Sequence, residues 1–216
     1  MNSAAPKIAA NRRIDPEIRK SIILDKTAIL IAKEGVSAVS MERIGREAGV
    51  SKALVYAYFK NQTNLLQSLL LREQRRLMER QSVAVSQATN FEELVLFTTR
   101  AYLKHYEEDG IFLQRLLHEP SLAVAFEERD RAERQRVVDF LSKEMARSFG
   151  VSPRVAAIAT ELSMGMTGAA GEMISRGAIS LNKVEEIIIC LFEGSMKSLS
   201  EKFARPTVAK PTANEP

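Results

Sequence analysis

Apolar residues recur along this chain every three to four positions, which is the spacing that places them on one face of an α-helix. No window shows the alternation of apolar and polar residues that marks a strand. Capping signals divide the pattern into elements, since Asp15-Pro16 can start a helix that Gly35 ends, and Ser40 and Ser51 can cap two short ones. The pattern therefore predicts an all-α chain of about nine helices.

The same signals place the later helices. Asn61 can cap a helix that runs to about Ala84, and Asn90 has capping-box spacing before a helix that ends near Asp109-Gly110. A short apolar helix is then expected over Ile111 to His118, ahead of Pro120. We expect the last three helices to cover about residues 121–149, 153–176 and 182–203.

The stretch from Ser40 to Asn61 holds two short helices joined by a tight turn that contains Gly49. Such a pair is typical of a helix-turn-helix, whose second helix enters the DNA major groove. An ordinary helical hairpin with half-buried tyrosines is the alternative interpretation. The inner positions expected to pack together are Met41, Ile44, Ala48, Val50, Val55 and Phe59, against Ile23, Ala28 and Ile31 of the first helix.

Charge supports the nucleic-acid interpretation. The 216 residues carry a net charge of +4, but residues 1–63 alone hold eleven Lys/Arg against six Asp/Glu. A small basic head on a near-neutral body is the layout expected of a DNA-binding domain with a second module attached. On the outward side of the second short helix, Lys52 could donate to guanine, and Ala53, Leu54 or Ala57 could touch a thymine methyl.

"ILDKTAILIAKEG" (23–35) and "SMERIGREAGVSKALVYAYFKNQTNLL" (40–66) resemble the N-terminal DNA-binding domain of the tetracycline-repressor (TetR) family of transcriptional regulators. This resemblance implies phosphate contacts at Ser40, Tyr56 and Gln62, and base reading by Lys52, Ala53, Ala57 and Tyr58. The candidate DNA-binding residues are Ser40, Arg43, Ser51, Lys52, Ala53, Leu54, Tyr56, Ala57, Tyr58, Lys60 and Gln62.

Three residues depart from the usual form of the family. Leu54 replaces a small or hydroxylated residue, Gly45 replaces a helix-favouring alanine, and Gln62 replaces a lysine that anchors a phosphate. Loss of that lysine should lower the salt dependence of binding, although Lys60 stands two residues away.

The resemblance also implies that the larger second domain dimerises and binds a small molecule. The last helix carries apolar residues at helical spacing, and its predecessor carries glycines that suggest close approach of another backbone. The alternatives are that these glycines kink the helix around a ligand or pack within one subunit. The candidate dimer residues are Gly165, Gly168, Ala169, Val184, Ile187, Ile188, Leu191 and Ser195.

A ligand pocket would need apolar and amphipathic side chains on the central helices. The candidates are Phe97, Tyr102, Tyr106, Phe112, Leu116, Phe126, Phe140 and Met164, although most residues of this kind form ordinary core. Their character favours an apolar effector. The run from Glu127 to Arg136 suggests an anion site, but its alternating signs are more typical of a solvated helix face.

Enzymatic and metal chemistry find little support. His105 and His118 lie thirteen residues apart without a cysteine pair, which argues against a structural zinc site, and the common hydrolase and nucleotide-binding motifs do not occur. The single cysteine, Cys190, lies in an apolar run and is expected to be a buried, inert thiol in a reducing cytoplasm. We expect no enzyme activity, no cofactor, no metal and no membrane span.

The expected organisation is a basic flexible arm (1–14), a helix-turn-helix DNA-binding domain (15–62), a ligand-binding and dimerisation domain (63–204) and a disordered tail (205–216). Two functions remain open. One is a regulator, usually a repressor, that binds double-stranded DNA as a homodimer and is released by a small apolar effector. The other is a constitutive or architectural DNA-binding protein without an effector.

Overall fold

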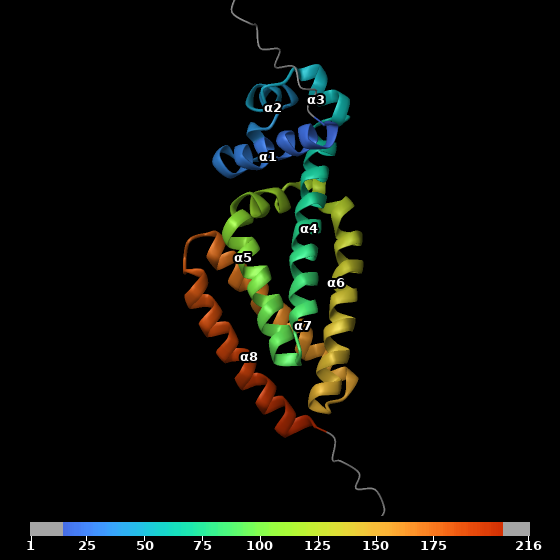
Figure 1. The fold of residues 1–216 in the computed structure, drawn as a ribbon, viewed down its shortest axis with the longest axis vertical. Coiled ribbons are helices and arrows are strands. Elements are labelled where there is room, and N and C mark those ends of the chain that lie inside the picture. Colours follow the sequence, from blue (N-terminus) through green and yellow to red (C-terminus); the bar gives the residue numbers. More distant parts are fainter. Residues whose placement is uncertain (1–14, 205–216) are drawn as a thin grey trace, which may run out of the picture. The chain divides into compact units, whose positions relative to one another are not determined.

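The computed structural model describes residues 15–204, and within them all side chains except those of residues 120, 121 and 123–130. This part of the chain holds eight α-helices, one short 3₁₀ helix and no strand longer than an isolated bridge (Figure 1). Two compact units divide between Leu69 and Leu70. The elements are α1 (Pro16–Glu34), η1 (Val36–Ala38), α2 (Met41–Glu47), α3 (Lys52–Tyr58), α4 (Gln62–Gln87), α5 (Phe91–Leu117), α6 (Pro120–Phe149), α7 (Pro153–Ser175) and α8 (Leu181–Phe203). The all-α prediction is confirmed.

The helices of the first unit start at the predicted caps. The Asp15 carboxylate accepts a hydrogen bond from the Glu17 amide at 2.8 Å, and the Ser40 and Ser51 hydroxyls each accept one from an amide three residues later at 3.1 Å. Asn61 does the same at the start of α4, at 2.8 Å. Each bond satisfies an amide that the first turn of a helix leaves without a partner.

The core of the first unit forms around one face of α3. Val55 and Phe59 are completely buried, as are Ile23 and Ile31 of α1 and Ile44 of α2. This is the inner face expected from the sequence, and Met41 and Ala28 are also buried in it. Ala48 and Val50, which were expected to join them, are only partly buried because they lie in the turn between α2 and α3.

Gly45, one of the departures from the family pattern, lies where α2 comes closest to the start of α3. A Cβ at this position would lie 2.9 Å from the Val50 carbonyl oxygen. The Val50 amide also donates to the Gly45 carbonyl at 2.8 Å. The glycine therefore permits a tight turn between the two short helices.

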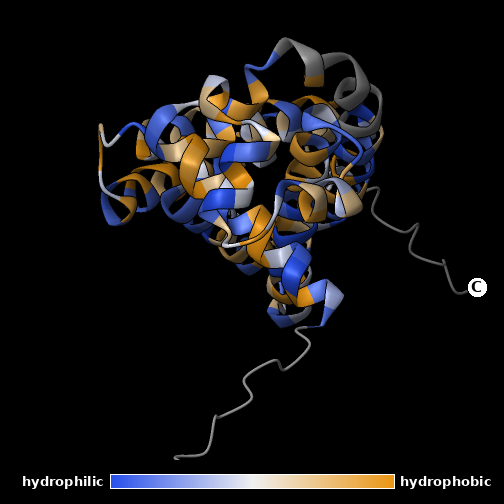
Figure 2. Ribbon diagram, turned by 90° about the horizontal axis from the view of Figure 1, so that it is seen from above, coloured by the Kyte–Doolittle hydropathy of each residue, from blue (hydrophilic) through white to orange (hydrophobic). Residues whose placement is uncertain are grey.

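The second unit packs α5 and α6 against α7, with α8 against both α5 and α7. Hydrophobic and hydrophilic residues are interspersed along the helices drawn in Figure 2. Two apolar clusters result: Phe91, Leu94, Met145, Val151, Ala156 and Ala159 form one, and Leu103, Ala170, Ile174, Val184, Ile188 and Phe192 form the other. None of the helices in the described part of the chain combines the length and apolar character that crossing a bilayer requires.

The structure corrects the prediction of two helices around residue 110. A single helix, α5, runs through Gly110 to Leu117. Gly110 is buried in the interior of this helix, and a Cβ there would lie 2.5 Å from the Ser175 Cβ of α7. The glycine thus marks a close helix crossing rather than a helix end, which is why α-helices number eight instead of nine in the described residues.

The start of α8 also differs from the prediction. The helix begins at Leu181, one residue before the expected start at residue 182, and extended Ser180 takes the cap position without a side-chain hydrogen bond. The Val184 amide donates to the Ser180 carbonyl at 3.0 Å, and this bond lets the helix begin earlier in the sequence than predicted.

Replacement of Gly110 by Ala should destabilise the protein. Alanine normally stabilises a helix interior relative to glycine by about 1 kcal/mol, but the Ser175 contact converts this gain into overpacking that costs about 1–3 kcal/mol. The free energy of unfolding in urea would measure the change. Lys104→Ala, an exposed position of the same helix, should stay within about 0.5 kcal/mol of the parent. A Gly110→Ala protein that is more stable than the parent would contradict the crossing.

Candidate nucleic-acid interface

The outer face of α3 carries the side chains expected to meet DNA. Lys52, Ala53, Tyr56 and Ala57 are exposed, with 47% of Tyr56 accessible, and Lys60 is exposed just after the helix. Leu54 and Tyr58 are partly buried at the border of this face. The face is fixed in orientation because Val55 and Phe59 on the opposite side are completely buried.

Ser40 and Ser51 hold two roles that do not compete. Each hydroxyl oxygen accepts a hydrogen bond from a backbone amide, and both residues are exposed. A hydroxyl that accepts through its oxygen can still donate its hydrogen. A phosphate oxygen would be a suitable acceptor, so a cap and a DNA contact can be made by the same serine.

Arg43 differs from the other candidates because its charge is already paired. Its guanidinium donates to the carboxylates of Glu47 at 2.8 Å and of Glu34 at 2.9 Å. The Glu47 hydrogen bond and the nearby Glu34 charge raise the pKa of Arg43, and Arg43 in turn lowers the pKa of Glu47. Arg43 thus connects α2 with the end of α1, and its net attraction for phosphate is reduced.

The turn into α4 is held by two asparagines. The Lys60 amide donates to the Asn64 side chain at 3.2 Å, and the Asn64 amide donates to the Asn61 side chain at 2.8 Å. Gln62, at the first position of α4, is exposed. A helix N-terminus carries a partial positive charge that favours phosphate, so the start of α4 would attract a phosphate placed there even without a lysine at position 62.

The residues proposed for the ligand pocket differ in their burial. Tyr102 and Tyr106 stack at 4.7 Å, and a Cβ on Gly171 would lie 3.0 Å from each ring. Phe112 and Leu116 are buried, whereas Phe140 is exposed. Phe97 and Met164 are partly buried, and Phe126 lies outside the described side chains. Phe112 and Leu116 thus belong to the core, and the two tyrosines pack against α7.

A hollow of about 450 Å³ lies elsewhere in the second unit. It is formed by the end of α4, the turn into α5 and the last turns of α6, and Phe140 is the one pocket candidate that lines it. Its other walls include Glu144 and Arg147, so they are polar as well as apolar. The hollow is open to solvent and partly polar, whereas the apolar effector expected from the sequence would suit an enclosed apolar cavity.

The candidate dimer residues fall into two groups. Val184 and Ile188 are buried in the apolar cluster of the second unit, so the structure moves them from the surface to the core. Gly165, Ala169, Ile187 and Leu191 are exposed on α7 and α8. Gly168 and Ser195 are partly buried.

The glycines of α7 have different surroundings. Gly171 makes room for the two tyrosine rings of α5, which is packing within one subunit, whereas a Cβ on Gly165 would meet nothing within 4 Å. Cys190, predicted to be buried, is exposed because it lies on the outward side of α8. Packing inside the unit therefore explains Gly171 but leaves Gly165 free to approach another chain.

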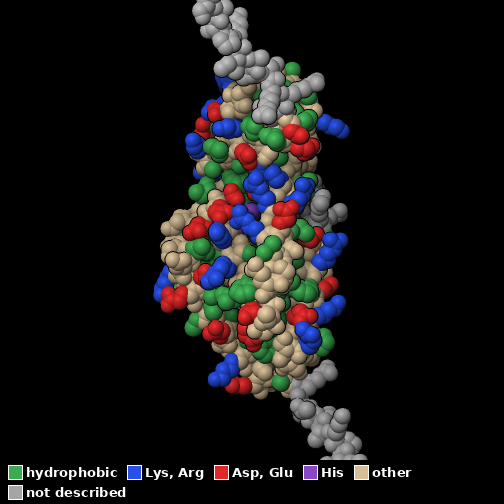
Figure 3. All heavy atoms as spheres, in the orientation of Figure 1, with side chains coloured by type: hydrophobic (Ala, Val, Ile, Leu, Met, Phe, Trp, Pro, Cys, Tyr) green, Lys and Arg blue, Asp and Glu red, His purple; other side chains and the backbone are tan. Residues whose placement is uncertain are grey.

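Charged side chains of the second unit are mixed in sign on the face drawn in Figure 3. Within the run from Glu127 to Arg136, Arg136 pairs with Glu133 at 3.2 Å on the surface, as expected of a solvated face. The side chains of residues 127–130 lie outside the described set.

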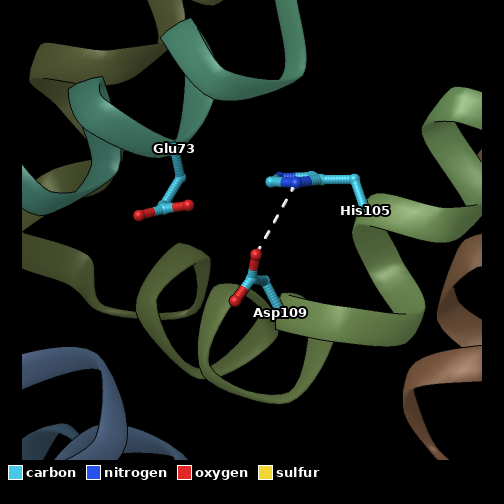
Figure 4. Close-up of side chains that lie close together, drawn as sticks. All are labelled: Glu73, His105 and Asp109. Carbon is cyan, nitrogen blue, oxygen red and sulfur yellow. Dashed lines mark ion pairs between the residues drawn. The ribbon is translucent and has the colours of Figure 1, made fainter. Parts of the chain in front are cut away.

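A polar cluster in the second unit was missed by the sequence analysis. Glu73 of α4 and His105 of α5 are buried, and Asp109 lies one turn after His105 (Figure 4). Burial lowers the pKa of His105 and raises that of Asp109. The four-residue spacing of His105 and Asp109 on a largely apolar helix was the available signal, but Glu73 is brought to them only by the fold.

Comparison with known proteins agrees with this geometry. Residues 23–69 match the family model described as "Bacterial regulatory proteins, tetR family". A TetR-like transcriptional regulator from Rhodococcus sp. RHA1 has the same fold, with a TM-score of 0.72 and 17% identity over 86% of this chain and 99% of that one. Residues 23–69 therefore carry the N-terminal domain of the tetR family, and the chain as a whole has the fold of a solved TetR-like regulator.

Two curated relatives match part of the chain. The HTH-type transcriptional repressor SCO4008 from Streptomyces coelicolor is 36% identical over 56 residues, which is 26% of this chain and 29% of the relative. The nucleoid occlusion factor SlmA from Mannheimia succiniciproducens is 28% identical over 79 residues, or 37% of each chain. The matches thus span about a third of the length of these relatives.

The Ser51 cap should be measurable in the stability of the protein. Ser51→Ala removes the acceptor for the Leu54 amide and should cost about 0.5–2 kcal/mol, whereas Ser51→Asn retains a capping side chain and should cost less. Thermal unfolding followed by circular dichroism would compare the two variants. Equal losses in both would show that the cap does not hold α3.

Proposed function

We propose that this protein is a sequence-specific, DNA-binding transcriptional regulator whose α3 reads the major groove. The observation that carries this proposal is the division of α3 into a buried side, Val55 and Phe59, and an exposed side with Lys52, Ala53 and Tyr56. A short helix with small and basic residues outward can approach base edges, while flanking hydroxyls and lysines hold the phosphates. The tetR-family match of residues 23–69 and the repressor named among its curated relatives support this proposal.

A homodimer is part of the proposal. On α7, Ile158, Leu162, Gly165 and Ala169 lie on one exposed stripe, with Leu162 66% accessible. The spacing of four, three and four residues keeps a helical stripe on one face. Exposed Ile187 and Leu191 form a similar stripe on α8. Apolar stripes on neighbouring helices favour an isologous interface made from two copies of this pair.

Two copies would place two α3 helices on one face of the duplex. Half-sites about 34–36 Å apart, one turn of DNA, then make a pseudo-palindromic operator. Repression, with release by a small apolar effector that favours a dimer of different spacing, is the form of regulation we propose. The stacked Tyr102 and Tyr106 and the hollow beside Phe140 are the places in the second unit where an effector would have to be sought.

A constitutive or architectural DNA-binding protein is the second candidate. Two observations favour it: Phe112 and Leu116 of the proposed pocket are buried in the core, and one curated relative is named a nucleoid occlusion factor rather than a repressor. This candidate keeps the same α3 surface and differs in having no effector.

Selection of bound sequences from a random duplex pool at about 150 mM salt would test the proposal, because specific and non-specific affinity separate there. Recovery of a pseudo-palindrome with half-sites about ten base pairs apart is expected. Binding without an enriched motif, which fades smoothly as salt rises, would contradict sequence-specific regulation and favour the architectural candidate.

Single substitutions should separate phosphate contacts from base contacts. Lys60→Ala and Tyr56→Phe should weaken binding to all sequences alike, and Lys60→Ala should lower the salt slope by about 0.9. Lys52→Ala should in addition relax base preference at one position of each half-site. Lys143→Ala, an exposed lysine of α6 with the same loss of charge, serves as the control. A changed base preference in Lys60→Ala would overturn the phosphate assignment.

The exposed stripes should control the oligomeric state. Leu162→Lys should convert the dimer to a monomer, because it places a charge at the centre of an apolar contact without removing buried core. Light scattering coupled to size-exclusion chromatography would give the mass. Val83→Lys, an equally apolar and exposed position of α4, should remain dimeric. A Leu162→Lys protein that stays dimeric would move the interface away from α7.

A further inference from the structure

Three potential metal ligands meet between α4 and α5. One ligand atom each from Glu73, His105 and Asp109 can be chosen so that all lie within 4.8 Å of one another. The three side chains point toward a common space in Figure 4, where the dashed line joins His105 Nδ1 and Asp109 Oδ2, 3.8 Å apart. Two ligand atoms on a tetrahedral zinc ion lie about 3.4 Å from each other, so small side-chain rotations would close the site.

His105 gives a separate reason to look for a ligand. Only 2% of this residue is accessible, and its Nδ1 has no hydrogen-bond partner. A buried polar atom without a partner is costly, and such atoms in folded proteins call for an explanation. The neutral imidazole ring is the form that binds metals. A cation in front of Nδ1 would supply the missing interaction.

The neighbouring arginines form ion pairs with Glu73 and Glu108. Glu73 accepts from Arg72 at 2.8 Å and from Arg76 at 3.2 Å, and Arg80 pairs with Glu108 at 2.6 Å. Asp109 has its ion-pair contact with His105, at 3.8 Å, and lies beside the Glu73 carboxylate. A divalent ion would compensate Asp109, while Arg72 and Arg76 would orient the Glu73 carboxylate as outer-shell partners.

We propose that Glu73, His105 and Asp109 form a binding site for one divalent transition-metal ion, with water completing its coordination. An imidazole nitrogen with two carboxylates suits zinc and the related first-row ions better than magnesium or calcium. His105 and Asp109 lie one turn apart on the same face of α5, and Glu73 faces them from α4. The ion would tie these two helices together. This site goes beyond the proposed function, because metal binding requires neither DNA nor an organic effector.

A calorimetric titration of the chelator-treated full-length protein with Zn²⁺ tests the site directly. The Cys190→Ser background removes the exposed thiol, which could bind zinc by itself. One ion per chain is expected, and the thermal midpoint should rise with zinc concentration because the ion binds the folded state. Co²⁺ in place of Zn²⁺ should give visible absorption bands that report nitrogen and oxygen ligands.

Variants identify the ligands. Asp109→Asn and His105→Gln should each weaken Zn²⁺ binding by at least about tenfold, since even outer-shell partners contribute that much. The matched controls are His118→Ala, the other histidine, whose Nδ1 lies 2.7 Å from the Gln114 carbonyl, and Glu107→Gln, an exposed acid of the same helix. If His105→Gln fails to fold, Asp109→Asn still decides the question, because Asp109 is partly exposed.

Three results would overturn the site: no zinc binding, zinc binding that Asp109→Asn leaves unchanged, or binding that is lost only in the controls.

Sodium acetate is a further probe, because Arg80 Nη1 is also buried without a partner. Stabilisation by acetate that Arg80→Gln abolishes, without any response to zinc, would assign the cluster to an anion and reject the metal. Since none of these measurements uses DNA, they are independent of the proposed regulator function.

Discussion

The arrangement of the first unit depends on the burial of Val55 and Phe59. The helix that carries Val55 has only seven residues, and a helix this short is not stable alone because nucleation costs more than two turns return. Its position is therefore imposed by packing against α2 and by a core in which Ile23, Ile31 and Ile44 are also completely buried. Full burial of one side fixes which residues the other side presents to the solvent.

Close helix crossings determine the second unit in a comparable way. Gly110 lets α5 approach Ser175 of α7, and Gly171 lets α7 approach the stacked rings of Tyr102 and Tyr106. Both contacts hold α5 and α7 face to face. Because α5 also carries His105 and Asp109, the same crossings limit how far these two side chains can move relative to the rest of the unit.

Local signals made much of the first unit predictable. Caps at Asp15, Ser40 and Ser51 and the spacing of the apolar residues determine the helix starts and the inner face of α3, because both depend on neighbours within a few residues. The second unit was harder to predict, because the predictions that failed there depend on contacts between residues far apart in sequence. Gly110 has the local signature of a helix end, and only the approach of Ser175 explains why the helix continues.

The candidate sites follow the same distinction. The exposed face of α3 was predictable, since the helical period of about 3.6 residues separates its inner from its outer positions. The pairing of Arg43 with Glu34 was not predictable, because it joins two helices. Cys190 was expected to be buried because its neighbours in sequence are apolar, whereas the structure places it on the outer side of α8. Glu73 could not be associated with His105 because 32 positions of sequence separate them, and only the packing of α4 on α5 brings them together.

The two-sided character of α3 has a consequence for how such a protein can diverge. Substitutions at Val55 or Phe59 would unfold the unit, whereas those at Lys52, Ala53 or Ala57 remove no buried contact. After gene duplication, one copy could therefore acquire a new DNA target through changes on the outer face alone. Each intermediate along that path would remain folded, so recognition can evolve at nearly constant stability.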